Sequence, residues 1–439
     1  MGSILITGGT VIDPANDRQG AFDLRLADGL VEAIGAPGTL AAADLQIEAA
    51  GCWVVPGLID MHVHLREPGQ EYKETVASGA RAAVAGGFTA VACMANTNPV
   101  NDSGAVTTYI VEQSRRADLA RVYPIGAVSV GLLGDRLAEI GEMHEAGIVA
   151  VSDDGRPIMD SALMRRALEY SSMFGLVVSV HEEDLALSAE GCMNEGPTAF
   201  RLGLKGMPAA AEEAMVARDI ALLERTGGRL HIAHASTAGT VDLVRRAKAR
   251  GLAVTAEATP HHFTLTEEAV GEYDTNAKMS PPLRLASDVA AVIAGLSDGT
   301  IDAIASDHAP HHRDEKDVEF ECAAHGIVGL ETSLALSLAL VREHGLTPAA
   351  LVRAMSVAPA RILGVPGGSL AVGGAADVTV IDPDASWSVD PDHFHSKSRN
   401  TPFGGWSLNG QACATIVGGV LKWRAAEPAA GRRKRSAAQ

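Results

Sequence analysis

Eight short apolar runs alternate with helix-like segments through the middle of the chain, and this alternation constrains the fold more than any other feature. The helix-like segments, such as 161–174, 209–225 and 240–250, carry apolar residues at helical spacing with charged residues between them. The apolar runs end near His62, Met94, Val128, Asp153, His181, His234, Glu257 and Asp307. Eight strands buried on both faces, each followed by a helix, predict an α/β fold with a parallel (β/α)8 TIM-type barrel. An open, doubly wound sheet is the alternative, and the strand count favours closure.

The two ends of the chain have a different texture. Residues 4–55 alternate short apolar runs with turn residues, and similar runs return at 377–381 and 414–421. Such turn-bounded runs are typical of small β domains, so we predict one β-sandwich built from both ends. After Trp423 the chain is rich in Ala, Pro and basic residues, which predicts a disordered tail. The predicted units are a sandwich of residues 1–55 plus 365–425, a barrel of residues 56–364 and a tail of residues 426–439.

Charge and hydropathy exclude two classes of protein. The chain has 36 Lys+Arg against 54 Asp+Glu, a formal charge of −18 with no basic motif, so we expect no nucleic-acid partner. The longest nearly apolar stretch, 334–341, is far shorter than the roughly 20 residues of a membrane span. No cationic residue precedes Arg18 and no apolar secretion segment follows it, so we expect a cytoplasmic protein.

The five cysteines are scattered and include no CxxC pair. They are Cys52, Cys93, Cys192, Cys322 and Cys413. This spacing argues against both a disulfide framework and a Cys-rich zinc site. We expect reduced thiols with mostly structural roles.

Histidines and aspartates cluster where a barrel carries its function, at the carboxyl ends of the strands. His62 and His64 are two residues apart, so both imidazoles leave the same face of a strand and can reach one ion. His231 precedes His234 by three, should point away from it, and is interpreted as structural. Imidazoles and carboxylates without thiols suit Zn²⁺ or a similar ion. Because four His and two Asp exceed the needs of one tetrahedral ion, we predict two metals bridged by a carboxylate and a hydroxide.

Longer motifs surround these residues. Residues 56–69 read PGLIDMHVHLREPG and residues 305–311 read ASDHAPH. Further motifs are NTNP at 96–99, DDG at 153–155, TPHH at 259–262, KMSPPLR at 278–284 and SRNTPF at 398–403. Together they resemble the amidohydrolase superfamily in its dihydroorotase form, over nearly the whole chain. The absence of any lysine between Lys73 and Lys205 is similar to the long-chain bacterial (type I) dihydroorotases.

The resemblance implies a ligand set. Many superfamily members bridge two metals with a carboxylated lysine after strand four, and this chain has no lysine there, so an aspartate must form the bridge. The family motif favours Asp154 as the shared ligand, with Asp153 as the alternative. One zinc ion would then take His62, His64 and Asp307, and the other would take His181 and His234.

The resemblance also implies a reaction and its substrate contacts. The activity expected is the reversible hydrolysis of L-dihydroorotate to N-carbamoyl-L-aspartate in pyrimidine synthesis, with Asp307 as the catalytic residue that carries the proton. The resemblance implies that Arg66, Asn96 and His311 contact the substrate carboxylate, and the planar guanidinium of Arg66 suits that group. The remaining substrate-binding positions are Ser280, His325 and Gly326. Ser280 stands where Asn is usual and His325 where Phe is common, and these two departures bear on substrate affinity and on the pH profile.

Several alternatives remain open at this point. Another cyclic amidase, acting on hydantoins, dihydropyrimidines or allantoin, would share barrel and metals, but Arg66 and the missing lysine weigh against it. An inactive structural partner of aspartate transcarbamoylase would be expected to lack metal ligands. We expect a homo-oligomer, specifically a dimer. Association with aspartate transcarbamoylase would be compatible with activity. Residues 308–326 are either a mobile lid over the site or an ordinary solvated loop. His261 and His262 receive no catalytic role.

Overall fold

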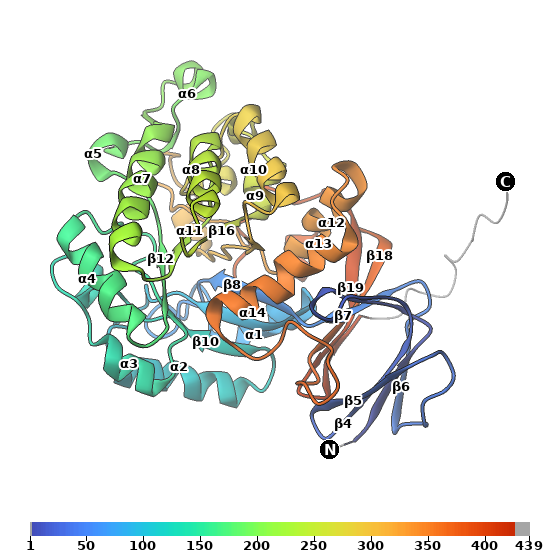
Figure 1. Cartoon of the computed structure of the whole chain (residues 1–439). Coiled ribbons are helices and arrows are strands. Elements are labelled where there is room, and N and C mark those ends of the chain that lie inside the picture. The colour runs from blue at the N-terminus through green and yellow to red at the C-terminus, as the bar shows by residue number, and fades with distance from the viewer. Residues whose placement is uncertain (1, 426–439) are drawn as a thin grey trace.

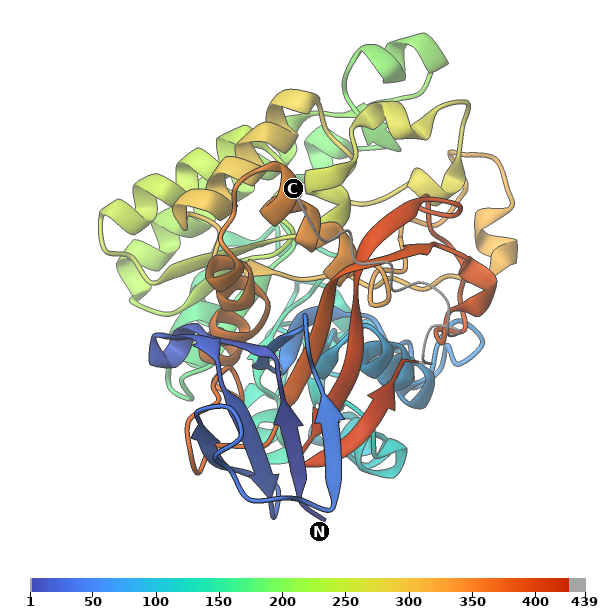
Figure 2. The same cartoon turned by 90° about the vertical axis from the view of Figure 1, so that its right-hand side faces the viewer.

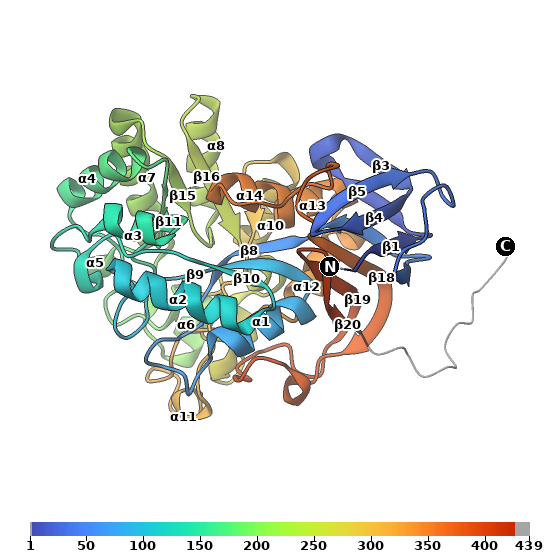
Figure 3. The same cartoon turned by 90° about the horizontal axis from the view of Figure 1, so that it is seen from below.

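A computed structural model describes residues 2–425, which form a barrel and a β-sandwich that lie side by side (Figure 1). The predicted tail at 426–439 lies outside the described residues. Figure 3, seen from below, places the sandwich strands to one side of the barrel. Among residues 2–425 no helix is both long enough and apolar enough to span a membrane.

The barrel contains the eight parallel strands that the sequence predicts. They are β8 (Leu58–Val63), β9 (Phe88–Cys93), β10 (Arg121–Pro124), β11 (Ala150–Val151), β12 (Val177–Val180), β15 (Leu230–Ile232), β16 (Val254–Ala258) and β17 (Ala303–Ile304). The ladders form two arcs, β10-β9-β8 and β11-β12-β15-β16-β17. Single parallel bridges join the arcs at both seams, from Gly126 to Val151 and from Val63 to His308.

Helices follow the strands and cover the outside of the barrel. The principal ones are α1 (Val76–Ala85), α2 (Gly104–Ala117), α3 (Ile140–Ala146), α4 (Ser161–Ser172), α7 (Ala209–Thr226), α8 (Ala238–Ala249), α10 (Ala286–Asp298) and α12 (Ser333–Glu343). In α4 the Asp160 carboxylate caps the first turn by accepting from Ala162 N and Leu163 N. Leu163, Ala167 and their neighbours at helical spacing are buried against the strands. The same local signals therefore start the helix and orient its apolar face.

Shorter elements complete the fold. These are α5 (Leu185–Ser188), α6 (Pro197–Leu202), α9 (Pro260–Thr264), α11 (Arg313–Lys316), α13 (Pro348–Val352), α14 (Ala358–Leu363), the parallel pair β13 (Met193–Asn194) and β14 (Gly206–Met207), the 3-10 helices η1 (Pro14–Asn16), η2 (Val130–Leu132), η3 (Glu267–Val270), η4 (Thr275–Ala277) and η6 (Pro391–His393), and the π-helix η5 (Arg353–Val357).

The sandwich is built from both ends of the chain, as predicted (Figure 2). One sheet has the order β5-β4-β1-β6 and the other β20-β19-β18-β7-β2-β3. The strands are β1 (Ile4–Thr7), β2 (Thr10–Asp13), β3 (Arg18–Ala21), β4 (Asp23–Ala27), β5 (Leu30–Gly35), β6 (Leu45–Glu48), β7 (Trp53–Pro56), β18 (Val378–Ser388), β19 (Ser407–Val417) and β20 (Val420–Arg424). Their shared core contains Ile6 and Leu24 from one end and Val380 and Ile416 from the other. The division of the chain near residues 56 and 365 stays a prediction.

Two barrel strands end earlier than the sequence predicted. The third ends at Pro124 rather than near Val128, and the eighth ends at Ile304 rather than near Asp307. Main-chain hydrogen bonds to both neighbouring strands continue through Ile125 and Gly126, and beyond them Val128 N donates to the Asp153 carboxylate instead of to a strand. The loops that carry the site therefore begin earlier than apolar patterning indicates.

Candidate metal centre

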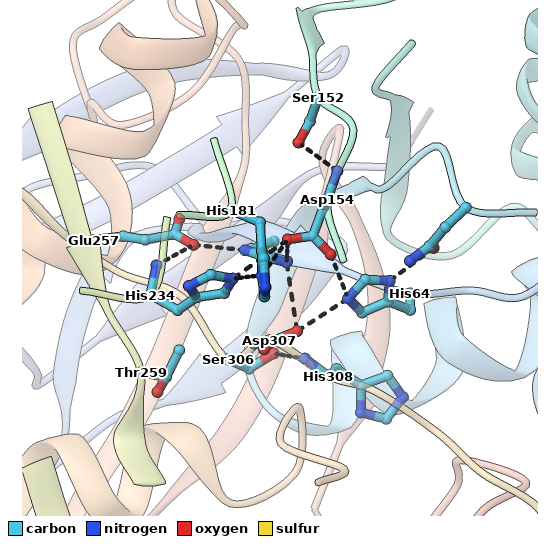
Figure 4. A network of polar contacts seen from close by, with 12 residues as sticks. His64, Ser152, Asp154, His181, His234, Glu257, Thr259, Ser306, Asp307 and His308 are labelled. Atoms are coloured by element: carbon cyan, nitrogen blue, oxygen red, sulfur yellow. Dashed lines mark hydrogen bonds and ion pairs between the residues drawn. The ribbon is translucent and has the colours of Figure 1, made fainter. Parts of the chain in front are cut away.

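Six predicted metal-binding side chains converge at the carboxyl end of the barrel, and Figure 4 labels all of them except His62. His62 belongs to β8, His64 follows that strand, and the others follow β11, β12, β15 and β17: Asp154, His181, His234 and Asp307. All six are buried. The six residues are spread over the 246 positions from residue 62 to residue 307. The parallel strands form a closed barrel, so their carboxyl ends meet and bring these side chains together.

One donor set consists of His62, His64 and Asp307, whose ligand atoms all lie within 4.8 Å of one another. Asp307 Oδ1 is 3.0 Å from His64 Nε2 and 3.4 Å from His62 Nε2. Burial would raise the pKa of Asp307, but the adjacent His62 and His64 rings hold it well below its ordinary range. Asp307 is therefore a carboxylate at neutral pH.

Asp154 connects this set to a second one. Its Oδ2 lies 3.5 Å from His64 Nε2, and its Oδ1 lies 3.4 Å from His62 Nε2. The same Oδ1 is 3.3 Å from His234 Nε2 and 3.8 Å from His181 Nδ1. The second compact donor set is His62, Asp154 and His234, with His181 Nδ1 only 2.9 Å from His234 Nε2. One Asp154 carboxylate thus faces histidines of both expected ions.

Hydrogen bonds on the outer ring nitrogens fix which atoms face the centre. His62 Nδ1 donates to Glu257 Oε1 at 2.6 Å, and His64 Nδ1 donates to Asn96 Oδ1 at 2.9 Å. In the neutral form of each ring, with the proton on the outer nitrogen, Nε2 directs a lone pair toward the carboxylates, and this is the form that binds a divalent cation. His62 Nε2 is buried without a hydrogen-bond partner. Lone pairs and carboxylate oxygens that converge in this way fit divalent cations, so the residues present suit a metal centre.

Glu257 extends the network behind His62. Its Oε2 accepts from His231 Nε2 at 3.1 Å, while Thr255 Oγ1 lies 2.8 Å from His231 Nδ1. Burial would raise the pKa of Glu257, but His62 and His231 beside it lower the pKa to about 2. The arrangement makes Glu257 a permanent anion that orients His62. His231 is in neither donor set and contacts Glu257, which lies between it and His62.

The alternative bridge, Asp153, lies outside both donor sets. Its Oδ1 accepts from Val128 N at 2.7 Å and from Ser129 N at 3.0 Å. Its other oxygen accepts from Ser129 Oγ. The two adjacent aspartates therefore separate by role: Asp153 holds the loop after β10, and Asp154 faces the imidazoles.

Three residues of the site adopt a backbone conformation that side chains disfavour. Arg66, His234 and Asp307 have φ angles of 62°, 34° and 46°. Positive φ in residues other than glycine is uncommon and concentrates at functional sites. All three positions follow the ends of β8, β15 and β17, so the positive φ interrupts the strand alternation where the site begins.

Arg66 and His311 meet beside the metal ligands. Arg66 Nε donates to Pro310 O at 3.1 Å, and Arg66 Nη2 donates to His311 Nε2 at 3.3 Å. Burial, together with the charge of Arg66, lowers the pKa of His311 to about 2, so this ring is neutral. Asn96 is close by through its bond to His64. These three residues, predicted to contact a carboxylate, occupy one side of the site.

The other predicted substrate residues lie near Glu183. Ser280 Oγ donates to Glu183 Oε2 at 3.5 Å, and His181 Nε2 donates to the same oxygen at 3.2 Å. His325 is exposed on the loop after β17. Gly326, next to it, has φ 154°, and a Cβ there would lie 2.6 Å from Ala309 O, so no larger residue fits.

The loop at 308–326 is partly packed rather than freely solvated. Two buried ammonium groups bind its main chain: Lys278 Nζ donates to Phe320 O at 2.7 Å, and Lys316 Nζ donates to Ala324 O at 2.8 Å. Asn400 Nδ2 also donates to Ala309 O and Gly326 O, at 2.9 and 3.0 Å. Lid motion stays a prediction.

Sequence reasoning gave no role to Glu257 and Glu183. A carboxylate near the end of the strand-like run 254–258 was a signal for Glu257, and the two-residue spacing from His181 was a signal for Glu183. His262 bridges Thr259 Oγ1 and Pro281 O, which is a structural arrangement. His261 is buried, and its Nε2 has no hydrogen-bond partner.

Known proteins resemble this chain over nearly its full length. A family model described as dihydro-orotase-like matches residues 51–240, and one described as amidohydrolase family matches residues 198–421. The dihydroorotase of Anaeromyxobacter sp. (strain K) is 58% identical over 420 residues, covering 95% of this chain and 97% of that protein. The dihydroorotase of Pelobacter propionicus is 56% identical over 422 residues, covering 96% of this chain and 100% of that protein.

Solved structures of related amidohydrolases share the architecture. The L-hydantoinase (dihydropyrimidinase) of Arthrobacter aurescens superposes with a TM-score of 0.85 at 26% identity and covers 96% of each chain. The dihydropyrimidinase of Brevibacillus agri has a TM-score of 0.84 at 22% identity over 96% of this chain and 95% of its own, a likeness of fold alone. The barrel with its sandwich is thus an amidohydrolase fold. Because the chain is more than half identical to these dihydroorotases along almost all of its length, it belongs to the dihydroorotase family.

Proposed function

We propose that the chain is a dihydroorotase that binds two zinc ions and reversibly hydrolyses L-dihydroorotate to N-carbamoyl-L-aspartate. In the direction of ring closure this reaction serves pyrimidine synthesis. One ion would be held by His62, His64 and Asp307, the other by His181 and His234. The observation that carries the proposal is Asp154, whose two oxygens face histidines of both sets. Its carboxylate supplies the bridge for which no lysine is present.

Asp307 is the proposed catalytic residue. When bound, two dications would supply Lewis-acid polarisation of a carbonyl and would acidify water to a pKa of about 7. The Asp307 carboxylate is ionised at neutral pH, so it can accept a proton from the attacking water. It would deliver that proton to the ring nitrogen as the C–N bond breaks. Water thereby adds across the amide, and Asp307 ends unprotonated.

The remaining site residues would orient the substrate. Arg66 presents a planar fork to the carboxylate of the ring, and the neutral His311 ring beside it keeps the guanidinium in place. Asn96 would complete this side, although its Oδ1 is used by His64. Ser280, His325 and Gly326 would border the ring from the side of Glu183.

A substrate comparison tests the proposal directly. Purified, zinc-analysed chain should turn over dihydroorotate far faster than uncharged hydantoin, because hydantoin offers no carboxylate to Arg66. Equal turnover of the two would favour the other cyclic amidases. A zinc-loaded chain without activity on either would leave the role of a non-catalytic partner of aspartate transcarbamoylase.

The equilibrium between ring and open chain should depend on pH. Ring opening creates a second carboxylate and releases one proton at neutral pH, so alkali favours opening and acid favours closure. Above the carboxyl pKa of about 4, the ratio of open to closed form should rise about tenfold for each unit of pH. Product ratios measured at equilibrium between pH 6 and pH 8 check this, and a constant ratio would contradict the substrate assignment.

Arg66→Ala should weaken substrate binding more than it slows turnover. Loss of charge-assisted hydrogen bonds to a carboxylate typically costs about 1.5–3 kcal/mol, which predicts a KM roughly 10- to 100-fold higher. Zinc content should be unchanged, because Arg66 is outside both donor sets. Arg66→Lys keeps the charge and loses the fork, so its KM should fall between those of the other two proteins. An unaltered KM for Arg66→Ala would remove Arg66 from the substrate site.

Glu257→Gln should weaken metal binding without removing a ligand. The amide keeps the shape of the side chain but loses the charge that His62 and His231 face at 2.6 and 3.1 Å. Partners of this kind usually contribute about 10- to 100-fold to metal affinity or activity. Competition with a chelator measures the zinc affinity. The matched variant is His231→Gln, which removes only the outer contact of Glu257 and should have the smaller effect.

Three further features stay predictions: the cytoplasmic location, the homodimer, and association with aspartate transcarbamoylase.

A further inference from the structure

Two cysteines from opposite ends of the chain meet in the sandwich, although their spacing in the sequence predicted only scattered structural thiols. Cys52 immediately precedes β7, and Cys413 lies in β19, 361 positions away. Their Sγ atoms are 3.9 Å apart. The Asp382 side chain of β18 adjoins both, so that the three ligand atoms lie within 4.8 Å of one another.

We propose that Cys52, Asp382 and Cys413 form a second metal site, which takes one thiophilic divalent cation such as Zn²⁺. Two thiolates on a tetrahedral zinc ion, each with a Zn–S distance of about 2.3 Å, are about 3.8 Å apart. The sulfur atoms here are already at that separation. Asp382 would supply an oxygen ligand, and water would complete the tetrahedron.

The sheet order explains why these two cysteines suit a shared cation better than a disulfide. β18 lies between β7 and β19, so the main chains of the two cysteines are separated by two strand spacings. Two spacings amount to roughly 9.5 Å, whereas a disulfide requires Cα atoms no more than about 7 Å apart. Side chains reaching over β18 from both sides can share an ion between them. They cannot bond to each other unless the strands move.

Electrostatics and access also favour a cation. All three side chains are half-buried, which leaves an approach from solvent. The contact with Cys52 lowers the pKa of Cys413, while burial and the Asp382 charge oppose this shift. Two thiolates and one carboxylate would carry a charge of −3, and a dication would reduce it to −1. The bound ion would fasten the first strands of the sandwich to the last.

Cadmium is a probe that distinguishes the two sites. Cadmium bound at the barrel centre would give no thiolate absorption, because the ligands there are imidazoles and carboxylates. The zinc-loaded, fully reduced chain is titrated with Cd²⁺ while the ultraviolet charge-transfer absorption of cadmium thiolates is recorded. We expect one equivalent to bind with this signature. Cys52→Ser and Cys413→Ser should each weaken that binding by about 100-fold or more, and Asp382→Asn by about tenfold.

Cys322→Ser is the matched control, since Cys322 is exposed and lies outside the group. It should keep the full signal, and circular dichroism should show that every variant is folded. Absence of a thiolate signal in the wild-type chain, or an equal signal in Cys52→Ser, would overturn the proposal. So would a loss of two mass units per reduced chain on exposure to air that is abolished in Cys413→Ser, because that result indicates a disulfide. Asp382→Asn retains both thiols and tests the same site if a serine variant fails to fold.

Discussion

Asp307→Ala should abolish the turnover of dihydroorotate almost completely. The substitution removes the proposed proton carrier and, with it, the carboxylate 3.0 Å from His64 Nε2. Proton transfer by a positioned side chain contributes about 10²- to 10⁴-fold, and the loss of a metal ligand adds to this. We therefore expect kcat to fall by at least about 10³-fold, which corresponds to a loss of about 4 kcal/mol of transition-state stabilisation. Steady-state assays measure the loss of turnover, and zinc analysis of each preparation measures the loss of bound metal.

Two comparisons sharpen this experiment. Asp307→Asn keeps the shape of the ligand but cannot accept a proton, so it should lose activity while retaining more zinc than Asp307→Ala. Asp302→Asn is the control, because Asp302 precedes β17 at its opposite end and binds Lys248 Nζ at 2.6 Å. It should affect stability alone. Turnover by Asp307→Asn within about tenfold of the wild-type chain would assign the proton transfer to another group.

Asp154→Asn and Asp153→Asn form a matched pair of neighbouring, isosteric changes with opposite expected results. Asp154 faces four imidazoles, so its amide variant should retain about one zinc ion instead of two and lose about 10²- to 10³-fold in kcat. Asp153 accepts from Val128 N and Ser129 N, contacts that an amide oxygen can partly keep. Its variant should lower the melting temperature and retain both ions.

Metal analysis and thermal unfolding of the two variants distinguish the outcomes. Loss of zinc from Asp153→Asn with full retention by Asp154→Asn would move the bridge to Asp153. Full activity in both variants would remove the shared carboxylate from the proposal altogether.

The fold was largely predictable because its signals are local. Apolar strands, helical spacing and turn residues each act over a few positions, and the count of eight strands then restricted the architecture. The loop after β10 was not predicted correctly, since it depends on a hydrogen bond between Val128 and Asp153, 25 positions apart. The apolar pattern of a sequence cannot show where a main-chain N–H donates to a side chain instead of to a neighbouring strand.

The ligands could also be anticipated, but their supporting residues could not. Strand parity places His62 and His64 on one face, and the barrel brings strand ends together without further information. Glu257 binds His62 across 195 positions, and Cys52 meets Cys413 across 361. Such pairs depend on the exact register and bending of strands, which a single sequence does not specify.

The sandwich sheet has a consequence for how the protein is made. β7 ends at Pro56 and pairs with β18, which begins at Val378. This pairing cannot form until 322 further residues have been synthesised. At about 5–20 residues per second this delay is roughly 15–65 seconds. During that time the edge of β7 is open to pairing with another nascent chain. A chain whose synthesis stalls before β18 would therefore expose the unpaired edge of β7 beside the barrel. Chaperone binding to the amino-terminal strands would be an advantage for this topology.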